Sequence, residues 1–446
     1  MNQEKEYRQC LETMYGFRRF GIKLGLDTIR RILSGLGNPQ DRFKTIHIAG
    51  TNGKGSVASS LSAILHEAGY RVGLYTSPHL LHFNERICVD NQPISDAAVV
   101  RAFSAVRETP KGEREPTFFE FATAMAMYEF ARQKTDWAVV ETGMGGRLDA
   151  TNVLKPEISV ITNVSVEHSE YLGDTLEQIT GEKGGIIKPG IPVVTGVRQE
   201  SAFEVLQKIA GEKSAPLYRF GKDFRTTGTP DQTFTYTGIR NTWPDMRTRL
   251  AGSHQIDNAA LTLAACEIIT ENGANIPEEA IRRGLHENCW PGRLEVVSES
   301  PYLILDGAHN LAAAENLAKF LKETFDPEKI TLVLGILDDK PYAEMLRFLL
   351  PVCRNAILTQ PKIHRALPVD TLRATAGEIR SELTSVPDVA RAVAYAMENA
   401  APDDVICVAG SLYVVGEAKE FLETLGFPSF RKTLQGDCPP DVCHRG

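Results

Sequence analysis

The chain has 446 residues, of which 42% are hydrophobic and 24% are charged. This ordinary globular composition excludes wholesale disorder and fibrous repeats, and the length predicts two domains because one hydrophobic core rarely organises so many residues. The formal net charge of -8 provides no overall attraction to phosphates of DNA or RNA, so no nucleic-acid partner is expected.

The amino-terminal stretch 1–18 alternates charged residues with short apolar runs, so it holds no segment suited to a secretory signal. No later apolar run reaches the roughly 20 residues that a membrane-spanning helix needs. We therefore expect a cytoplasmic protein with no membrane partner. The eight cysteines are scattered without a CxxC pair, which argues against a zinc or thioredoxin-type site.

Apolar strand-like runs alternate with helical patterns through most of the chain. This alternation is typical of α/β architecture, with a mostly parallel sheet and helices on both of its faces. One helical pattern keeps an apolar face from Val57 to Ala68, and Gly69 is suited to end it. In the first part of the chain the pattern predicts strands at 45–49, 71–75, 137–141, 157–162 and 191–195, and helices at 116–132 and 176–187.

The stretch 218–249 is rich in Thr, Phe, Gly and Pro and predicts an antiparallel elaboration. The helical pattern stops near Trp290, and a fresh α/β series follows. We predict a first, mostly parallel α/β domain at 1–294, a smaller Rossmann-like α/β domain at 295–430, and a flexible tail at 431–446. In the second domain the pattern predicts strands at 302–305, 330–334, 356–359 and 405–409, and helices at 311–323 and 389–398.

The segment 47–56, with the sequence HIAGTNGKGS, places three glycines, a lysine and a hydroxyl group between a predicted strand and a predicted helix. Glycines let backbone N–H groups converge on an anion, and the helix amino terminus adds positive potential. Lys54 can bridge terminal phosphates, and Ser56 can act through Mg²⁺ or a hydrogen bond. The usual Walker pattern fails because position 48 is Ile and Gly55 separates the lysine from the serine, although the physical ingredients survive. The loop predicts that the first domain has a P-loop-type ATP-binding fold. A structural turn without a ligand is the alternative.

Candidate metal ligands follow neighbouring predicted strands. Glu141 ends the apolar run 137–140, His168 follows the next strand, and Ser77 and His79 follow an earlier one. The carboxyl ends of parallel strands face the ligand crevice, and Mg²⁺ takes a few hard oxygen ligands. A lone histidine is more often a hydrogen-bonded structural residue, so the convergence of strand ends carries the hypothesis rather than any single residue.

The predicted helix 176–187 carries Lys183, and Lys188 follows it directly. Lys183 is a candidate to face the site, although its spacing alone does not decide this. Lys188 is interpreted instead as a positive charge that complements the carboxyl end of the helix dipole.

The sequence resembles the folylpolyglutamate synthases and dihydrofolate synthases, within the superfamily of Mur cell-wall peptide ligases. The resemblance runs from about Tyr15 to Leu425 and involves an ordered set of separated motifs. They are GTNGKGS at 50–56, TSPHL at 76–80, ETGMGGRLDATN at 141–152, EKGGIIK at 182–188, HQIDNA at 254–259, WPGRLE at 290–295 and LDGAHN at 305–310.

The resemblance implies roles for individual residues. The implied ATP-binding residues are Gly53, Lys54, Gly55, Ser56, Asn258, Arg293 and Asp306, and the implied Mg²⁺ ligands are Ser77, Glu141 and His168. The implied residues of the pterin site are Thr117, Phe118, Phe119, Glu120, Leu148, Asp149 and Ala150.

Three residues are implied in catalysis: Lys54, Lys183 and His309, of which His309 shares the second-domain motif with Asp306. Lys183 matches a lysine that the family carries as an N6-carboxylated derivative, which converts a cation of pKa about 10.4 into an anionic oxygen ligand. One departure is Gly184, where relatives often have Ala. The added backbone freedom is expected to loosen the helix by roughly 0.5 to 1 kcal/mol without changing the chemistry.

The implied activity is that of an acid–amino-acid ligase with Mg²⁺ and ATP. ATP would phosphorylate a substrate carboxylate, and the amine of L-glutamate would attack the acyl phosphate, with tetrahydrofolate or 7,8-dihydropteroate as the acceptor. Charge neutralisation and positioning are the main tasks of such an enzyme, and domain closure would bring in Arg293 and Asp306. We expect a monomer.

Three other functions stay open on the residues alone. A Mur-type ligase acting on a UDP-linked peptide precursor would share the ATP machinery. A P-loop kinase or GTPase would transfer phosphate to an alcohol or to water, and a nucleotide-binding regulatory module would bind ATP without turnover.

Overall fold

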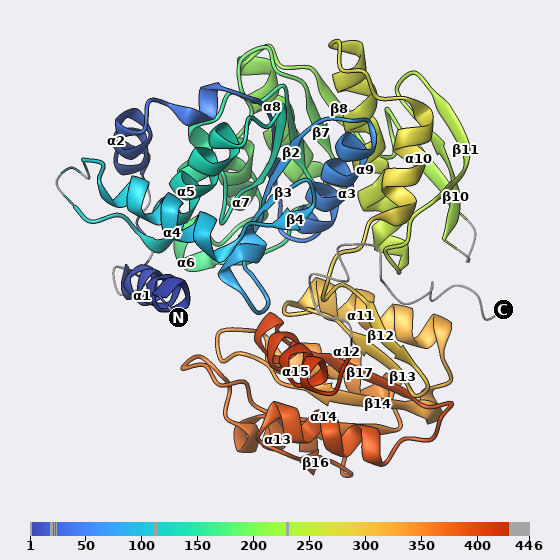
Figure 1. The fold of residues 1–446 in the computed structure, drawn as a ribbon. Helices are drawn as coiled ribbons and strands as arrows, with labels where there is room; N and C mark the ends of the chain where they lie inside the picture. The colour runs from blue at the N-terminus through green and yellow to red at the C-terminus, as the bar shows by residue number, and fades with distance from the viewer. Residues whose placement is uncertain are drawn as a thin grey trace. The chain divides into compact units, whose positions relative to one another are not determined.

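The computed structural model describes residues 2–17, 21, 23, 25–110, 112, 114–228 and 232–427. The chain divides into two compact units (Figure 1). Unit 1 comprises the residues up to Thr248 together with Ile256–Asn288, and unit 2 comprises Arg249–Gln255 and the residues from Cys289 onward. The predicted tail 431–446 lies outside the described residues, and the boundary predicted after residue 294 stays a prediction. None of the described helices combines the length and the apolar character that a membrane span requires.

Unit 1 is built on an eight-stranded sheet in the order β4-β3-β2-β5-β1-β6-β7-β8. The strands from β2 to β8 in this order are parallel, whereas β3 and β4 form an antiparallel edge. The strands are β1 (Lys44–Ala49), β2 (Val72–Tyr75), β3 (Ile87–Val89), β4 (Gln92–Pro93), β5 (Trp137–Glu141), β6 (Ile158–Ile161), β7 (Val193–Thr195) and β8 (Leu217–Arg219).

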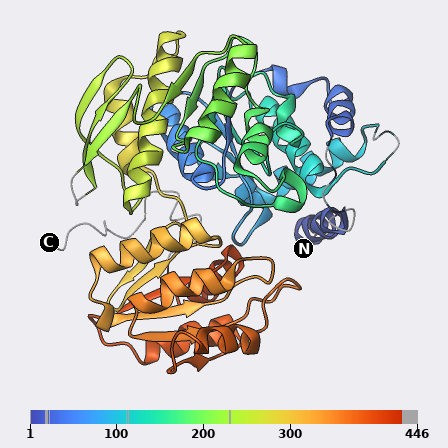
Figure 2. The same ribbon diagram turned by 180° about the vertical axis from the view of Figure 1, so that it is seen from behind.

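Helices lie on both faces of this sheet, and for that reason its central strands are almost wholly apolar. In Figures 1 and 2, α3 and α5 lie on opposite sides of β2. The helices of this part are α1 (Asn2–Gly16), α2 (Asp27–Gly35), α3 (Lys54–Glu67), α4 (Asp96–Arg107), α5 (Phe118–Arg132), α6 (Ser169–Leu172), α7 (Leu176–Gly184) and α8 (Glu200–Glu212), with the short 3₁₀ helix η4 (Ala150–Val153). Every residue of β5 is buried, so the apolar run that predicted this strand reflects cover on both faces.

A three-stranded antiparallel sheet, β9 (Arg225–Gly228), β10 (Thr233–Thr237) and β11 (Thr242–Arg247), completes unit 1 with α9 (Ser253–Glu271) and α10 (Glu278–Glu287). The buried carboxylate of Glu267 in α9 holds the turn between β10 and β11. It accepts hydrogen bonds from the Tyr236 hydroxyl (2.8 Å) and from the backbone N–H groups of Ile239 (2.8 Å), Arg240 (3.2 Å) and Asn241 (2.6 Å).

Unit 2 contains a six-stranded sheet in the order β12-β13-β17-β14-β15-β16, parallel except for β12 at its edge. Helices α11 and α12 pack on one another, as do α14 and α15. The elements are β12 (Glu295–Glu299), β13 (Tyr302–Leu305), α11 (Leu311–Thr324), β14 (Ile330–Leu334), α12 (Tyr342–Leu349), β15 (Asn355–Leu358), α13 (Val369–Gly377), β16 (Thr384–Ser385), α14 (Val389–Glu398), β17 (Val405–Ala409) and α15 (Leu412–Thr424).

The predicted fold class is confirmed, with two local corrections. Leu217–Arg219 belongs to the parallel sheet, so the antiparallel elaboration begins later than predicted. Helix α7 ends at Gly184 rather than at residue 187. The segment after β5 packs against this end of the helix, because the Arg147 backbone N–H donates to the Glu182 carbonyl at 2.7 Å and a Cβ atom on Gly185 would lie 2.3 Å from the Arg147 Cα atom.

The early end of α7 also corrects the interpretation of Lys188. Its ammonium group donates to the backbone carbonyl (3.0 Å) and to the side-chain Oδ1 atom (2.8 Å) of Asn152, so it binds the 3₁₀ helix η4 rather than the end of α7. Gly184 closes α7 against α8, where a Cβ atom would approach the Ile209 Cδ1 atom to 2.7 Å. Close packing therefore accounts for the glycine better than helix flexibility does.

Replacing Glu267 by Gln is expected to lower the free energy of unfolding by about 1–3 kcal/mol, because the amide has one acceptor oxygen for four donors, one of which is the buried Tyr236 hydroxyl. Glu271→Gln is a matched control on the same helix, since Glu271 forms an exposed ion pair with Arg240 and its loss should cost less than about 1 kcal/mol. Urea denaturation of both variants measures the difference. Equal effects of the two substitutions would contradict the capping role of Glu267.

Candidate active site

The glycine-rich loop connects the end of β1 to the start of α3 and is shaped by two glycines with positive φ. Gly50 has φ +149° and Gly53 has φ +84°. A Cβ atom on Gly50 would lie 1.9 Å from the Thr162 Oγ1 atom, and one on Gly53 would lie 2.4 Å from the Asn258 Oδ1 atom. Both positions therefore require glycine for space as well as for backbone conformation. The contact also places Asn258 of α9 directly against the loop.

The end of β6 fixes the outer part of the loop. The backbone N–H groups of Thr51 and Asn52 donate to the backbone and side-chain oxygens of Asn163, each at 2.9 Å. The Thr162 hydroxyl donates in turn to the carbonyl of Asn52 at 2.6 Å. A loop held in this way is preformed for a ligand at the amino terminus of α3.

Lys54 starts α3, and its side chain folds back over the loop. Its ammonium group donates to the carbonyl oxygens of Gly50 (3.0 Å) and Thr51 (2.9 Å) and lies 3.9 Å from the Glu141 Oε1 atom. Glu141, at the end of β5, accepts a hydrogen bond from the backbone N–H of Ser77 at 3.1 Å. The structure thus brings together the loop, its lysine and two of the three predicted metal ligands.

Lys183 of α7 reaches the same loop from the other side, with a side chain that is 1% exposed. Its ammonium group donates to the Gly50 carbonyl at 2.9 Å and to the Glu167 Oε1 atom at 3.0 Å. Burial lowers the pKa of Lys183 to about 8, although Glu167 acts in the opposite direction. Burial by itself raises the pKa of Glu167, but Lys183 and Lys54 lower it below its ordinary value.

The sequence analysis did not identify Glu167 as a site residue. The signal that could have found it is a carboxylate directly before His168 at the end of a buried strand. His168 itself is exposed, adopts a left-handed backbone (φ +51°) and precedes α6. Its charge contributes to the lowered pKa of Glu167, so the imidazole lies near that carboxylate.

The donor set suits a hard divalent cation. The described residues contain no group of three or more His, Cys, Asp and Glu side chains placed to hold a metal. Mg²⁺ keeps several waters and takes one or two carboxylates together with substrate phosphates, so the Ser77 hydroxyl, the buried Glu141 carboxylate and the half-buried Glu167 carboxylate fit it. An imidazole such as that of His168 suits softer metals better than it suits Mg²⁺.

Four of the predicted substrate residues lie at the amino terminus of α5. The side chains of two of them, Thr117 and Glu120, form the helix cap. The Thr117 hydroxyl accepts from the Glu120 backbone N–H (3.2 Å), and the Glu120 carboxylate accepts from the Thr117 backbone N–H (2.8 Å). Arg114 also binds both oxygens of Glu120, at 2.7 and 2.8 Å. Phe118 and Phe119 are only half-buried, so they are better placed than Thr117 and Glu120 to contact a ligand.

Phe118 belongs to an aromatic cluster on this side of unit 1. Its ring stacks on that of Tyr15, with centroids 5.7 Å apart, and the Arg86 guanidinium lies 5.1 Å from its centroid. Phe119 packs against the segment that follows β5, because a Cβ atom on Gly143 would lie 2.6 Å from its ring. The start of α5 and the segment after β5, which hold the predicted substrate residues, are therefore adjacent. Glu141, at the end of β5, lies between this region and Lys54 of the phosphate loop.

Asp149 organises the glycine-rich segment after β5, between half-buried Leu148 and buried Ala150. One carboxylate oxygen accepts from the backbone N–H groups of Gly143 and Met144, both at 2.9 Å. The other accepts from the Thr151 N–H (2.9 Å) and the Thr151 hydroxyl (2.5 Å). Burial raises the pKa of Asp149, while these four hydrogen bonds lower it in turn.

His47 of β1 holds Asp149 in place through the hydroxyl group of Thr151. Because the Thr151 hydroxyl donates its proton to Asp149, it must accept from the Nε2–H group of His47, 2.8 Å away. The His47 side chain is fully buried, and burial lowers its pKa to about 3, so the ring is neutral. Its Nδ1 atom is then an unprotonated acceptor and is buried with no partner. His47 and Thr151 form a fixed support for the loop rather than a proton relay.

The remaining predicted residues, Arg293, Asp306 and His309, lie in unit 2. Asp306 follows β13 and accepts from the backbone N–H groups of Leu294 and Ala308, each at 2.9 Å. Burial raises its pKa, and the nearby Arg293 opposes that rise. The Nδ1 atom of His309 lies 2.8 Å from the carbonyl oxygen of Gly307 and donates to it.

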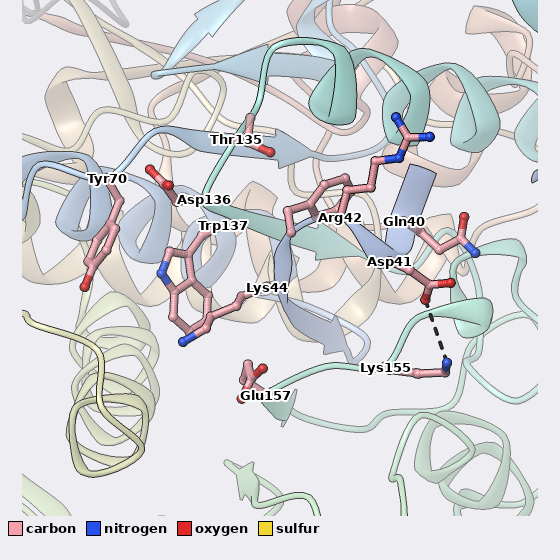
Figure 3. Close-up of a pocket in the computed structure, with 11 residues that line it drawn as sticks. Gln40, Asp41, Arg42, Lys44, Tyr70, Thr135, Asp136, Trp137, Lys155 and Glu157 are labelled. Carbon is pink, nitrogen blue, oxygen red and sulfur yellow. Dashed lines mark ion pairs between the residues drawn. The ribbon is translucent and has the colours of Figure 1, made fainter. Parts of the chain in front are cut away.

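A pocket in unit 1 lies at the other edge of the sheet, where β1 and β5 begin (Figure 3). The ammonium group of Lys44 lies 5.3 Å from the centroid of the Trp137 ring, and Lys155 pairs with Asp41 at 3.8 Å. None of the predicted site residues lines it, so it is separate from the phosphate loop. Its lining residues are Gln40, Asp41, Arg42, Phe43, Lys44, Tyr70, Thr135, Asp136, Trp137, Lys155 and Glu157.

The architecture and the loop agree with a known class of enzymes. Residues 48–266 match the Mur ligase middle domain, and residues 292–412 match the Mur ligase, glutamate ligase domain. The phosphate loop on a parallel sheet, followed by a separate α/β unit, is therefore that of a Mur ligase.

Individual relatives narrow the class to a family. The chain is 38% identical to the dihydrofolate synthase/folylpolyglutamate synthase of Bacillus subtilis over 434 residues, which cover 94% of this chain and 99% of the relative. It is also similar to the structure of Escherichia coli FolC in complex with DHPP and ADP, with a TM-score of 0.87, 31% identity and coverage of 94% and 98% of the two chains. A bifunctional folylpolyglutamate synthase/dihydrofolate synthase with Mn, AMPPNP and L-glutamate bound is 31% identical, with a TM-score of 0.84 and coverage of 93% and 98%. The chain belongs to the folylpolyglutamate synthase/dihydrofolate synthase family.

Replacing Thr151 by Val removes the hydroxyl between His47 and Asp149. We expect the free energy of unfolding to fall by about 1–3 kcal/mol, because both buried groups lose a partner. Amide hydrogen exchange at Gly143 and Met144 should also become faster, since the orientation of the Asp149 carboxylate is less restricted.

Thr195→Val is the matched control for this substitution. Thr195 is buried in β7, and its hydroxyl donates to the Ile161 carbonyl at 3.0 Å. This variant should lose comparable stability and leave exchange at Gly143 and Met144 unchanged. Unaltered exchange in both variants would show that Thr151 does not order the loop.

Proposed function

We propose that the chain is an ATP-dependent ligase that joins L-glutamate to tetrahydrofolate, extending a poly-γ-glutamyl tail, and that the same site serves 7,8-dihydropteroate. The observation that carries this proposal is the convergence of the glycine-rich loop, Lys54, Glu141 and Ser77 at one edge of the sheet in a chain of this family. The bound ADP, AMPPNP, Mn, L-glutamate and DHPP in the related structures support it. The same relatives do not favour a ligase for UDP-linked peptides.

The proposed reaction needs no protein nucleophile. A carboxylate is a poor acyl donor, so ATP first transfers its γ-phosphoryl group to the acceptor carboxylate and releases ADP. The amine of glutamate then attacks the acyl carbon, and phosphate leaves as the amide forms. The contribution of the enzyme is therefore positioning and charge neutralisation.

The residues of unit 1 would divide these tasks. The N–H groups at the start of α3, with Gly53, Gly55 and Ser56, would hold phosphate oxygens, and Lys54 would leave the loop carbonyls to offset their charge. Ser77, Glu141 and Glu167 would hold Mg²⁺, with His168 nearby. When bound, Mg²⁺ neutralises charge on the phosphates.

Substrate and nucleotide contacts outside the loop follow from the exposure of the side chains. The half-buried rings of Phe118 and Phe119 would contact the pterin, while Thr117, Glu120 and Asp149 would keep those segments in place. Asn258 in unit 1 and, in unit 2, Arg293, Asp306 and His309 are proposed to bind or orient the nucleotide. A monomeric state stays a prediction.

Lys183 is proposed to carry an N6-carboxyl group. A carbamate forms from the neutral amine, and a pKa of about 8 leaves about a tenth of Lys183 neutral at pH 7. The modification would place an anion beside the Glu167 carboxylate, and two neighbouring carboxylates favour a divalent cation.

The fate of oxygen-18 in the acceptor carboxylate tests the reaction. The enzyme is supplied with Mg-ATP, L-glutamate and labelled tetrahydrofolate or dihydropteroate. The label is expected in the released phosphate, because one carboxylate oxygen leaves with it. Unlabelled phosphate would exclude the acyl phosphate.

Omitting single components of the same assay separates the rival functions. ADP release without an acceptor would point to a hydrolase or kinase. ATP binding without any acceptor-dependent turnover would point to a regulatory module.

Nuclear magnetic resonance with ¹³C-bicarbonate tests the modification of Lys183. A carbamate carbon signal is expected in the wild-type protein and should be lost in Lys183→Arg. Lys188→Arg is the matched control, because burial also lowers the pKa of Lys188 to about 8 but Lys188 contacts Asn152 rather than the loop. A signal that persists in Lys183→Arg, or that is absent from the wild type with Mg-ATP bound, would rule the modification out.

A further inference from the structure

A buried ion pair in unit 2 joins α15 to the first residue of β12. Lys419 donates to the Oε1 atom of Glu295, and the two side chains are 1% and 5% exposed. Two charges removed from water lose much of their hydration, and an apolar pair of the same size often stabilises a fold equally well. The pair therefore calls for a reason beyond stability.

The second oxygen of Glu295 points to the turn that carries Arg293. Its Oε2 atom accepts a hydrogen bond from the backbone N–H of Gly292 at 2.9 Å. With Lys419 on one oxygen and Gly292 on the other, the carboxylate has a fixed orientation. The ammonium group of Lys419 thus acts on the turn through Glu295.

The backbone of the Gly292–Leu294 turn adopts the left-handed conformation at two residues. Gly292 and Leu294, on either side of Arg293, have φ values of +70° and +48°. Left-handed backbone is costly for leucine, so such a turn persists only where its surroundings hold it. The Gly292 carbonyl accepts from the Gly307 N–H at 2.8 Å, and the Leu294 N–H donates to Asp306 at 2.9 Å.

The side chain of Arg293 is held by the same turn. Its Nη1 atom donates to the Gly292 carbonyl at 3.0 Å, and a Cβ atom on Gly307 would lie 2.3 Å from that nitrogen. A change in the orientation of Gly292 would therefore move the guanidinium directly.

We propose that Lys419, acting through Glu295, is a positioning residue that sets the Gly292–Leu294 turn and so aims Arg293 at the nucleotide. This inference rests on the proposed nucleotide-binding role of Arg293. It assigns a function in the ligase reaction to a buried lysine of α15, which would act through its ion pair with Glu295.

Kinetics of the full-length Lys419→Met variant test the proposal. We expect KM for ATP to rise about tenfold while KM for the folate acceptor changes by less than about twofold, since only the nucleotide contact is displaced. Lys419→Arg should recover most of the ATP affinity, because a guanidinium can also bind the Glu295 carboxylate. Leu422→Ala, a buried core substitution on the same helix, is the control for general destabilisation and should lower Tm without a selective change in KM for ATP.

The double variant Lys419→Met/Glu295→Met separates positioning from stability and also covers the case in which Lys419→Met does not fold. It removes both buried charges, so Tm should return toward the wild-type value, whereas KM for ATP should stay raised because the carboxylate that holds Gly292 is gone. Recovery of both Tm and KM would overturn the proposal, as would an effect of Lys419→Met no more selective than that of Leu422→Ala.

Arg293→Ala distinguishes a failure of this inference from a failure of the proposed function. If Arg293→Ala leaves KM for ATP unchanged, the nucleotide-binding role of Arg293 is wrong. If Arg293→Ala raises KM for ATP and folded Lys419→Met does not, only the positioning role of Lys419 is wrong.

Discussion

The backbone carbonyl of Gly50 accepts hydrogen bonds from two lysine side chains, Lys54 at the start of α3 and Lys183 in α7. Because both ammonium groups bind the same carbonyl, two positive charges lie close together beside the amino terminus of α3. Glu141 and Glu167 lie beside these cations and balance them. The arrangement of the phosphate loop, α7 and the ends of β5 and β6 depends on this charge balance, because the buried Lys183 and the half-buried Lys54 are not stable there without their acceptors.

Space is the second constraint at the loop. Gly50 and Gly53 have positive φ, and they also lie against side chains that leave no room for a Cβ atom. The close approach to Asn258 brings α9 to the phosphate loop, although the two segments are far apart in the chain. The same glycines that allow backbone N–H groups to face an anion thus also permit the tertiary contacts around it.

Buried carboxylates shape three loops of this molecule in the same way. Asp149 holds the segment after β5, Glu267 holds the turn between β10 and β11, and Glu295 holds the turn that carries Arg293. Each accepts hydrogen bonds from backbone N–H groups of its loop and so fixes the path of the chain there.

The amino-acid sequence by itself determined the fold class, most strands and the phosphate loop. The bounds of β5, β13, β14, β17 and α14 agree with those predicted, because strands covered on both faces are continuous apolar runs and an amphipathic helix has its own period. The glycines and Lys54 were recognisable because phosphate binding places its requirements within one short segment.

Only the tertiary structure decided which polar and charged side chains become partners. Glu167 and Lys183, His47 and Thr151, and Lys419 and Glu295 are separated in the chain, and local patterns carry no information about such partners. The end of α7 also differs from the predicted one, and the contacts of Arg147 with Glu182 and Gly185 at that end join segments that are far apart in the chain. Propensity and periodicity act over a few residues, whereas desolvation and packing act between segments that only the folded chain brings together.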